Sequence, residues 1–327
     1  MEICSINVNE LFTDTLWRFK VAGKLVETRN GKAYRINEPV LTIIQEPTER
    51  VLFFQERDAN PIFHLMESIW MLAGRDDVLF LKQFNSTIGQ FSDDGVRFNA
   101  AYGYRMRKHF GFDQLNEVIK HLKEDPNSRQ AVIQLWDSSD FNKSTKDKAC
   151  NTQLIFAIND GRLDITINNR SNDFWWGACG ANPVHFSVIQ EFVAVALELP
   201  VGRYYSISNN LHLYTELYNA MPYMENPPIA ENFDHYSSGV VQPRKLYEGS
   251  SELFLHECEE FCKDPFSNQG YINEFFTYVA HPMAMVSHER KYKISDGRAW
   301  ADKIIASDWK LATHLYIANR EKKNVSK

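Results

Sequence analysis

The sequence predicts a single mixed α+β domain built around a large β-sheet. Strand-like and helix-like segments alternate along the 327 residues without the regular rhythm of βαβ units. Residues 150–173 carry a strong β-hairpin signal. A long and mostly apolar segment follows at residues 184–202, and it suits a helix that is buried on most sides against a sheet.

The composition is that of an ordinary globular protein, and it argues against some classes of binding partner. The chain is 44% hydrophobic, and its formal net charge of -6 argues against a constitutive nucleic-acid binder, which carries a basic face. There is no run of about 18 apolar residues, so no transmembrane helix is expected. The start, "MEICSINVNE", lacks the basic and apolar regions of a signal peptide.

The five cysteines are scattered and odd in number, which indicates a reducing compartment. We therefore expect a cytoplasmic protein. Cys258 and Cys262 lie one helical turn apart, but no second Cys/His pair has the spacing of metal ligands, so no metal site is expected.

Start and stop signals define the elements on either side of the hairpin. Residues 60–77 predict a helix with Asn60 as N-cap, Pro61 at its first position and Gly74 as its stop. Three further elements are predicted: an amphipathic helix at 112–126, a strand at 129–137, and a strand running into a helix at 203–221.

We expect one domain over residues 1–327, with two additions. Residues 221–250 are rich in Pro, Asn, Ser and Gly and predict an irregular surface insertion. Residues 295–323 predict an extra C-terminal helical segment that is basic at its end.

The hairpin signal is Asp160-Gly161, which stands between two strand-like runs as a two-residue type I′ turn requires. Paired residue numbers then sum to 321. The expected pairs are Asn159 with Arg162, Ile158 with Leu163, Phe156 with Ile165, Leu154 with Ile167, Thr152 with Asn169, and Cys150 with Ser171. This side of the sheet is apolar near the turn and polar at its far end.

The polar end of the hairpin predicts a ligand cleft around Cys150. A free cysteine is most often a small buried hydrophobe. Here the neighbouring Arg170 favours thiolate over thiol, and the thiolate is the nucleophile. Arg170 and Ser171 suit the binding of an anion or a hydroxyl, and Asp173 suits a hydrogen-bond acceptor.

Several motifs, taken in order and spacing, resemble thymidylate synthase and its relatives, the pyrimidine nucleotide hydroxymethylases. They are "HLMESIWMLAG", "AAYGYRMR", "SRQAVIQLWD", "ACNTQ", "RSND", "NPVHFSVIQEF" and "NNLHLY". The resemblance runs from about residue 25 to 215. It implies a large mixed sheet flanked by helices and a homodimer formed through the sheet face.

The resemblance also implies a folate-dependent reaction at the C5 position of a pyrimidine nucleoside monophosphate. Cys150 would add to C6, and C5 would attack the one-carbon unit of 5,10-methylenetetrahydrofolate. After the folate departs, water addition to the exocyclic methylene gives a hydroxymethyl group, whereas hydride transfer gives a methyl group.

The family roles map onto residues as follows. The catalytic residues would be Cys150, Glu67, Tyr102 and Asp173, and the folate would contact Asp173 and Trp70. The nucleotide would contact Arg29, Arg129, Arg170, Ser171, Ala181, Asn182, His212 and Tyr214, with Arg129 reaching across the dimer. From the residues alone, Glu67 equally suits a salt-bridged core carboxylate, and Tyr102 equally suits packing.

Three departures from the synthase pattern concern the nucleotide. Asn151 and Asn172 stand where synthases have a histidine and usually a cysteine, and "RSND" looks more like the hydroxymethylases. The stretch from Arg170 to Asn182 is one residue longer than in synthases. Either Ala181 or Asn182 therefore takes the position that reads the base. A synthase arginine pair is here Arg129-Gln130.

Two further departures from the synthase pattern concern the access of water to the reacting carbon. Gly89 and Phe91 stand in the region where synthases place a tryptophan near C5, and the chain lacks the short apolar tail that closes synthase sites. Both favour hydration. The expected activity is therefore hydroxymethylation, with dCMP or CMP preferred. Alternatives are a thymidylate synthase, a dUMP hydroxymethylase, a non-catalytic nucleotide-binding homologue, and a cysteine hydrolase.

Overall fold

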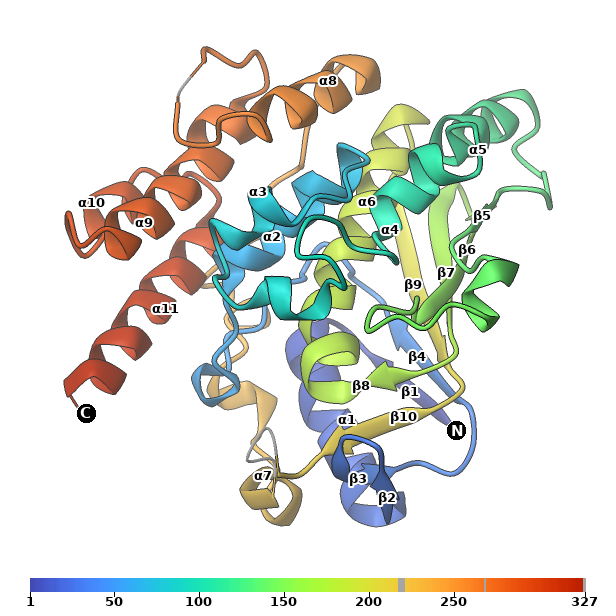
Figure 1. The fold of residues 1–327 in the computed structure, drawn as a ribbon, viewed down its shortest axis with the longest axis vertical. Coiled ribbons are helices and arrows are strands. Elements are labelled where there is room, and N and C mark those ends of the chain that lie inside the picture. The colour runs from blue at the N-terminus through green and yellow to red at the C-terminus, as the bar shows by residue number, and fades with distance from the viewer. Residues whose placement is uncertain (217–220, 268, 326–327) are drawn as a thin grey trace.

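The protein contains a six-stranded mixed sheet toward one side of the fold, in a computed structural model that describes residues 1–216, 221–267 and 269–325 (Figure 1). In spatial order the strands are β1 (Glu2–Ser5), β4 (Val40–Ile44), β9 (Val201–Ser208), β7 (Arg162–Asn169), β6 (Asn151–Asn159) and β5 (Val132–Gln134). β1 runs parallel to β4, and β7 runs parallel to β9, while the other neighbours are antiparallel. The predicted α+β class with a large mixed sheet is confirmed.

A second sheet lies beside the first. Its order is β2 (Lys24–Thr28), β3 (Gly31–Arg35), β10 (Leu211–Tyr214) and β8 (Asn172–Asp173). The single strand predicted at 203–221 is wrong, because the chain passes from β9 in one sheet to β10 in the other. The helix predicted after it falls partly on residues 217–220, which lie outside the described residues, and α7 (Met221–Glu225) follows.

The crossing between the sheets occurs at Asn209 and Asn210, where the backbone changes partners. The N–H of Asn209 donates to the carbonyl of Asn169 (2.9 Å), and the N–H of Asn172 donates to the carbonyl of Asn210 (2.9 Å). These two bonds tie the end of β7 to the start of β10. The polar residues that follow β7 are thereby fixed at the junction of the two sheets.

Helices α2 (Pro61–Leu72) and α6 (Asn182–Ala196) form the buried layer beside the large sheet (Figure 1). Asn60 caps α2 as predicted, since its side chain accepts the N–H of Phe63 at 3.1 Å. Residues of α6 are buried on nearly all sides, as predicted, but the helix ends at Ala196 rather than near residue 202, because β9 begins at Val201. The remaining helices of this part are α1 (Val8–Ala22), α3 (Val78–Lys82), α4 (Tyr102–Tyr104) and α5 (Gln114–Glu124).

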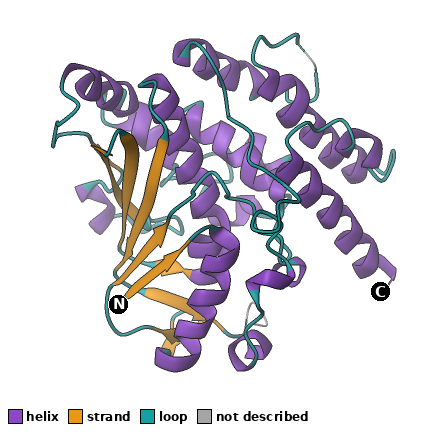
Figure 2. Ribbon diagram, turned by 180° about the vertical axis from the view of Figure 1, so that it is seen from behind, coloured by secondary structure: helices purple, strands orange, loops and turns teal. Residues whose placement is uncertain are grey.

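The C-terminal helices form an outer layer on α2. They are α8 (Ser251–Phe261), α9 (His281–Lys291), α10 (Arg298–Ala301) and α11 (Ser307–Val325), and α8, α9 and α11 contact α2 (Figure 1). Seen from behind, the strands lie toward one side of the molecule and the helix that leads to the C-terminus lies on the other (Figure 2). The helical segment predicted at 295–323 is therefore two helices. Regular structure among residues 221–250 is limited to α7 and a 3-10 turn at Ala230–Asn232. In the described part of the chain, no helix is both long and apolar enough to cross a membrane.

The hairpin of β6 and β7 has the predicted turn and most of the predicted register. Asp160 and Gly161 have φ angles of 51° and 72°, as a type I′ turn requires. The pairing sums to 321 from Asn159 with Arg162 as far as Gln153 with Asn168. Beyond that point a bulge shifts the register.

The bulge at Thr152 makes the expected pairing of Cys150 with Ser171 wrong. The carbonyl of Thr152 accepts the N–H groups of both Leu135 and Trp136, at 2.9 and 3.0 Å, which holds it toward β5. Asn151 then pairs with Asn169, and the carbonyl of Cys150 accepts the N–H of Arg170 at 3.0 Å. Arg170 thus stands directly opposite the cysteine.

Candidate active site

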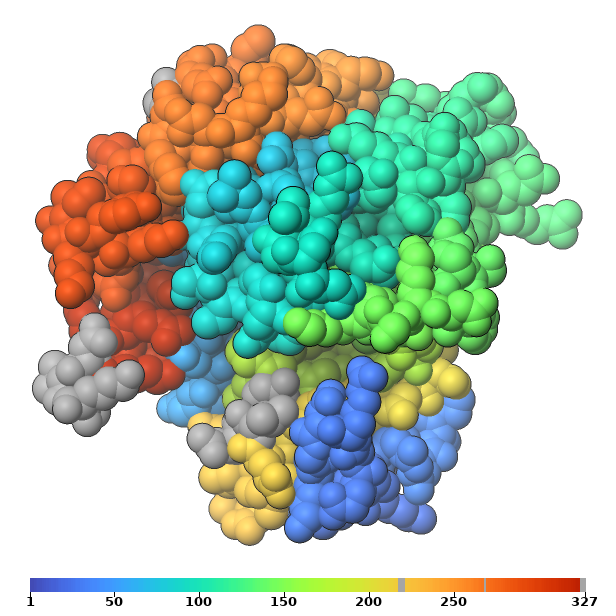
Figure 3. Space-filling view, in the orientation of Figure 1, coloured from blue at the N-terminus to red at the C-terminus, as the bar shows by residue number. Residues whose placement is uncertain are grey.

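Cys150 lies at the wall of a cavity of about 450 Å³ between the β2–β3 hairpin and the loop that leads into β6. In the space-filling view the hairpin and this loop stand on either side of a hollow (Figure 3). Five cationic side chains line it: Arg29, Arg35, Lys146, Lys148 and Arg170. Ser171, Asn210, His212 and Tyr214 also line it. We call this the basic cavity, and its charge suits an anionic ligand.

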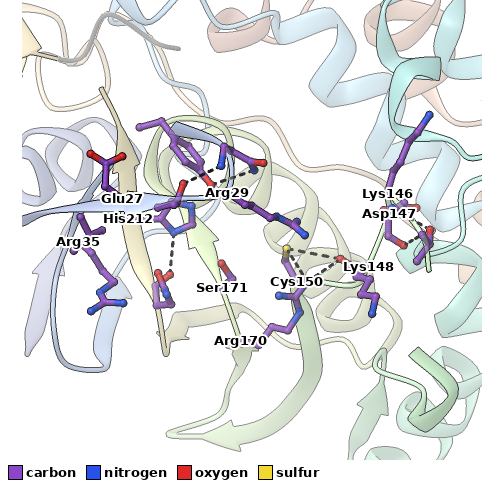
Figure 4. A pocket seen from close by; sticks show the side chains of 16 residues that line it. Glu27, Arg29, Arg35, Lys146, Asp147, Lys148, Cys150, Arg170, Ser171 and His212 are labelled. Atoms are coloured by element: carbon purple, nitrogen blue, oxygen red, sulfur yellow. Dashed lines mark hydrogen bonds between the residues drawn. The ribbon is translucent and has the colours of Figure 1, made fainter. Parts of the chain in front are cut away.

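Two arginines approach Cys150 from different sheets (Figure 4). The Nη2 of Arg170 lies 3.8 Å from the sulfur, and its Nε donates to the carbonyl of Ala149 at 2.8 Å. Arg29 extends toward the same sulfur from the turn of the β2–β3 hairpin. Both positive charges act to lower the pKa of the Cys150 thiol.

Arg170 favours the thiolate of Cys150, as expected, but its charge does not outweigh burial in the ligand-free chain. Burial raises the pKa of the Cys150 thiol above its ordinary value, and the charges of Arg170 and Arg29 offset this only in part. The carboxylates of Asp147 and Asp173 raise it further. The thiol is therefore mostly protonated at neutral pH, and forming the thiolate needs a further favourable interaction.

His212 and Tyr214 reach the basic cavity from β10, which pairs with β3 and so lies beside the hairpin that carries Arg29. Their rings contact edge to face at 4.9 Å. The hydroxyl of Tyr214 accepts the side-chain N–H of Asn30 at 3.3 Å. Burial lowers the pKa of His212, so its imidazole is neutral at pH 7. This pair can offer polar atoms to a ligand without adding charge.

A second, more apolar cavity of about 240 Å³ lies beyond Tyr102. Its walls include Trp70, Leu81, Ile88, Phe91, Phe98, Ala181 and Asn182, together with Glu67 and His185. Asp147 lines both cavities, so the two are neighbours. We call this second space the apolar cavity. Its flat aromatic walls suit a planar ring system.

Tyr102 connects the apolar cavity to the cysteine. Its hydroxyl oxygen accepts the backbone N–H of Cys150 at 3.0 Å and that of Asn151 at 3.2 Å. Burial strongly raises the pKa of Tyr102, and a negative charge on Cys150 would raise it further. The phenol therefore stays protonated and retains a hydrogen that it can donate.

Glu67 projects from α2 into the apolar cavity and meets His185 of α6. The Nε2 of His185 lies 3.3 Å from Oε2 of Glu67, close enough for an ion pair but not aligned as a hydrogen bond. His185 was not predicted as a site residue. It lies in a mostly apolar helix that also buries Ser187, Gln190 and Glu191, so its polar ring did not stand out in the sequence.

Ala181 and Asn182 both line the apolar cavity, so the structure brings together the two residues between which the sequence left the choice open. Only Asn182 has a side chain that forms hydrogen bonds. Its Nδ2 donates to Oδ1 of Asn172 at 3.2 Å. Asn182 is therefore the polar group of this wall that can read a ligand's edge.

Two predicted site residues do not line either cavity. Asp173 caps the π-helical segment Phe174–Ala181, since its Oδ1 accepts the N–H of Trp176 at 2.6 Å. Its Oδ2 is buried without a hydrogen-bond partner among the described residues. Burial raises the pKa of Asp173 to about 7. Arg129 is exposed in the loop before β5 and lies outside the basic cavity of its own subunit.

Besides His185, sequence reasoning missed five charged residues that line the basic cavity: Glu27, Arg35, Lys146, Asp147 and Lys148. Three of them stand in the loop before Cys150, whose sequence has no periodicity. The signal that could have identified these three residues is their closeness in sequence to Cys150. Asp147 is held by the backbone N–H of Ala100, at 2.8 Å from its Oδ2, and burial raises the pKa of its carboxyl.

Comparison with known proteins gives a consistent family relationship. The family described as thymidylate synthase matches residues 54–228. The chain is 40% identical to the deoxyuridylate hydroxymethyltransferase of Pseudomonas phage M6 over 96% of this chain and 93% of that protein. It is 41% identical to the deoxyuridylate hydroxymethyltransferase of Bacillus phage SP01 over 64% and 58% of the two chains. The thymidylate synthase of Symbiobacterium thermophilum is 29% identical over 52% and 62%.

Proposed function

The chain belongs to the thymidylate synthase family and is a one-carbon transferase, and we propose that it catalyses hydroxymethylation of dUMP at C5. The observation that carries the proposal is the position of Cys150, which faces Arg29 and Arg170 in the basic cavity and is joined through Tyr102 to the apolar cavity. A nucleophile with anion-binding groups on one side and a flat apolar space on the other suits a nucleotide beside a planar cosubstrate.

The choice of dUMP rests on the relatives. The hydroxymethyltransferases of phages M6 and SP01 are named for deoxyuridylate, and the former is similar over nearly the whole chain. The preference for dCMP or CMP expected from "RSND" has no such support. The amide of Asn182 offers a donor and an acceptor, so it suits the edge of uracil as well as that of cytosine. Cytidylates therefore remain the comparison substrates.

Cys150 supplies the nucleophile in this proposal. Its thiolate adds to C6 of the uracil, and the electron pair of the C5–C6 bond moves onto C5 and the C4 carbonyl. Tyr102 can donate its hydroxyl hydrogen close to the base, because its oxygen already accepts the N–H of Cys150. Elimination of the thiolate at the end restores the C5–C6 double bond. The arginines favour the anionic sulfur in both steps.

The basic cavity would hold the phosphate and the sugar. Arg29, Arg170 and Ser171 would bind the phosphate, since guanidinium groups match phosphate oxygens in pairs. His212 and Tyr214 would bind the sugar hydroxyl. Arg129 would join the phosphate ligands from a second subunit of a homodimer.

A homodimer through the sheet face is part of the proposal. The face of the large sheet opposite α6 carries side chains that are half-buried or exposed: Leu41, Ile43, Tyr205 and Ile207. Polar side chains such as Thr166, Asn168 and Arg203 stand on the same face, and such a mixed face suits a self-complementary interface. Since two of the most similar relatives are phage proteins, we also propose that the enzyme acts in the cytoplasm of a host cell.

Family members use methylenetetrahydrofolate, which supplies a one-carbon unit when bound. The residues present fit it. Trp70, Phe91 and Phe98 would pack against its flat rings in the apolar cavity. Asp173 lies outside the lining of the apolar cavity, but its buried Oδ2 has no hydrogen-bond partner among the described residues, and such an atom would suit the N–H donors of a pterin.

Water is the proposed final reagent because polar groups stand among the aromatic walls of the apolar cavity. Glu67, His185 and Asp147 all line it and can hold a water molecule, and Phe91 is 51% exposed at its wall. Water adds its oxygen to the exocyclic methylene carbon, and its proton goes to Glu67. The electron pair of that double bond returns to C5 and then expels the Cys150 thiolate.

The test is a product assay with the purified protein, methylenetetrahydrofolate and either dUMP, UMP, dCMP or CMP. Mass spectrometry of the dUMP reaction is expected to show 5-hydroxymethyl-dUMP, with tetrahydrofolate as the other product. A methylated base with dihydrofolate would establish a synthase instead. As a control, C150A is expected to lose both product formation and tritium release from C5 of labelled dUMP. Tritium release that persists in C150A would contradict the assigned nucleophile.

A further inference from the structure

Three side chains link the large sheet to the wall of the apolar cavity in a continuous series of hydrogen bonds. Asn172 is the middle member and is only 4% exposed. Its Oδ1 accepts from Nδ2 of Asn182 at 3.2 Å, and its Nδ2 donates to Oγ of Ser208 at 3.0 Å. Asn182 is the member that reaches the cavity.

The position of Asn172 is fixed by the backbone around it. Its N–H donates to the carbonyl of Asn210 at 2.9 Å, and β8 pairs in parallel with β10. Gly177 leaves the space for its side chain, because a Cβ at that position would lie 2.5 Å from Oδ1 of Asn172. The contact between Asn172 and Asn182 is therefore enclosed on the side of the π-helical segment.

We propose that Asn172 determines the base preference of the enzyme by holding the amide of Asn182 in one orientation. This rests on the proposed function, in which Asn182 reads the edge of the base. Uracil presents an acceptor at C4 and a donor at N3, whereas cytosine presents a donor at C4 and an acceptor at N3. Rotation of the Asn182 amide by half a turn would exchange its donor and acceptor and so exchange the preferred base.

The series opposes this rotation. If Asn182 alone rotated, its Oδ1 would face Oδ1 of Asn172, and two buried acceptors would be left without a hydrogen between them. The serine hydroxyl can both donate and accept, so the three groups can invert only together. An aspartate at position 172 has acceptors only, and it would keep Nδ2 of Asn182 facing it. An alanine at 172 would leave the amide of Asn182 free to take either orientation.

The experiment measures the ratio of the dissociation constants for dUMP and dCMP, by calorimetry without folate, in the wild-type protein and its variants. N172D is expected to keep the wild-type ratio to within about twofold, whereas N172A is expected to lower the preference by about tenfold or more. S208A is expected to lower it less. S206A is the matched control, since Ser206 lies on the same strand but contacts Asn169 instead.

A ratio measured on one sample does not depend on the fraction of protein that is folded, so a loss of stability in N172A does not affect the result. An unchanged ratio in N172A, or equal losses in N172A and N172D, would overturn the role of Asn172. A different result would contradict the proposed function: the wild-type protein would form no hydroxymethylated product from any of the four nucleotides.

Discussion

The imidazole of His185 lies 3.3 Å from the carboxylate of Glu67, and both line the apolar cavity. His185 is 4% exposed, and its ring meets the ring of His64 edge to face at 6.3 Å. Burial and the charges of Arg57 and His185 hold the pKa of His64 well below its usual range. The neutral His64 thus supports the ring of His185 without repelling it.

This arrangement predicts that His185 positions Glu67. In H185F the carboxylate loses its nearest polar neighbour, and kcat is expected to fall about tenfold, or about 1.4 kcal/mol, with the KM for dUMP nearly unchanged. H185Q keeps an N–H donor and is expected to recover part of the loss. Steady-state kinetics over a range of pH measures both. A change confined to the KM for dUMP would show that His185 acts on the nucleotide instead.

The hydrogen bonds that the Tyr102 hydroxyl accepts predict a second effect on kcat. Y102F removes the oxygen that accepts the N–H groups of Cys150 and Asn151, so two part-buried donors lose their partner. An unsatisfied donor costs up to about 1–3 kcal/mol when it is fully buried. We expect kcat to fall about 10- to 100-fold, since 1.4 kcal/mol corresponds to about tenfold. Single-turnover kinetics with dUMP measures this, and a melting curve checks the fold. Unchanged activity would show that Tyr102 is only packing.

The raised pKa of Cys150 predicts slow alkylation at neutral pH. Because burial raises the thiol pKa, reaction with iodoacetamide is expected to accelerate with pH above the range of an ordinary cysteine. R170Q removes a charge that lowers this pKa and is expected to slow the reaction further at any given pH. Mass spectrometry in a C4S background isolates the signal, since Cys179, Cys258 and Cys262 are buried. Faster alkylation of R170Q would contradict the assigned effect of Arg170.

Local chemistry explains how much of the hairpin the sequence could predict. The turn at Asp160-Gly161 sets the register through neighbouring residues, and the pairing follows it up to Gln153 with Asn168. The bulge at Thr152 depends on Leu135 and Trp136, which donate to it from a distant part of the chain. A contact of that kind leaves no local pattern.

The difference between local patterns and contacts with other parts of the chain also applies to the active site. Cys150, Arg170 and Ser171 were found because they stand at the open end of the predicted hairpin, whereas Lys146 and Asp147 occupy a loop without periodicity. In other places the signal was present but not used. Asn7 caps α1 by accepting the N–H groups of Asn9 and Glu10, as a polar residue before an apolar helix does, yet no helix was predicted there.

A buried carboxyl far from the site predicts a pH effect on stability. Burial raises the pKa of Asp308 from 3.8 to about 6, while the hydroxyl of Tyr236, which donates to it at 2.9 Å, and the charge of Arg50 oppose the shift. Between these pH values the folded chain keeps a proton that the unfolded chain has lost. The free energy of unfolding therefore falls as pH rises from about 4 to about 6.

In D308N this contribution is absent. The difference between the variant and the wild-type protein in the free energy of unfolding is expected to change by up to about 3 kcal/mol between acid and neutral pH, in favour of the variant at neutral pH. Urea denaturation at a series of pH values measures it. A difference that does not vary with pH would show that Asp308 ionises alike in both states.

The exposed position of Arg129 predicts that two subunits share each active site. Arg129 lies outside the basic cavity of its own chain, so C150A and R129A would damage different parts of one site in a dimer. Mixing the two inactive or weakly active variants, after dissociation and reassociation, is expected to restore about a quarter of the wild-type activity at low dUMP, because half of the dimers are hybrids with one complete site. Activity at limiting dUMP measures the recovery, and mixing C150A with C150A gives the baseline. If Arg129 bound phosphate within its own subunit, no hybrid would contain a complete site and the mixture would show no gain.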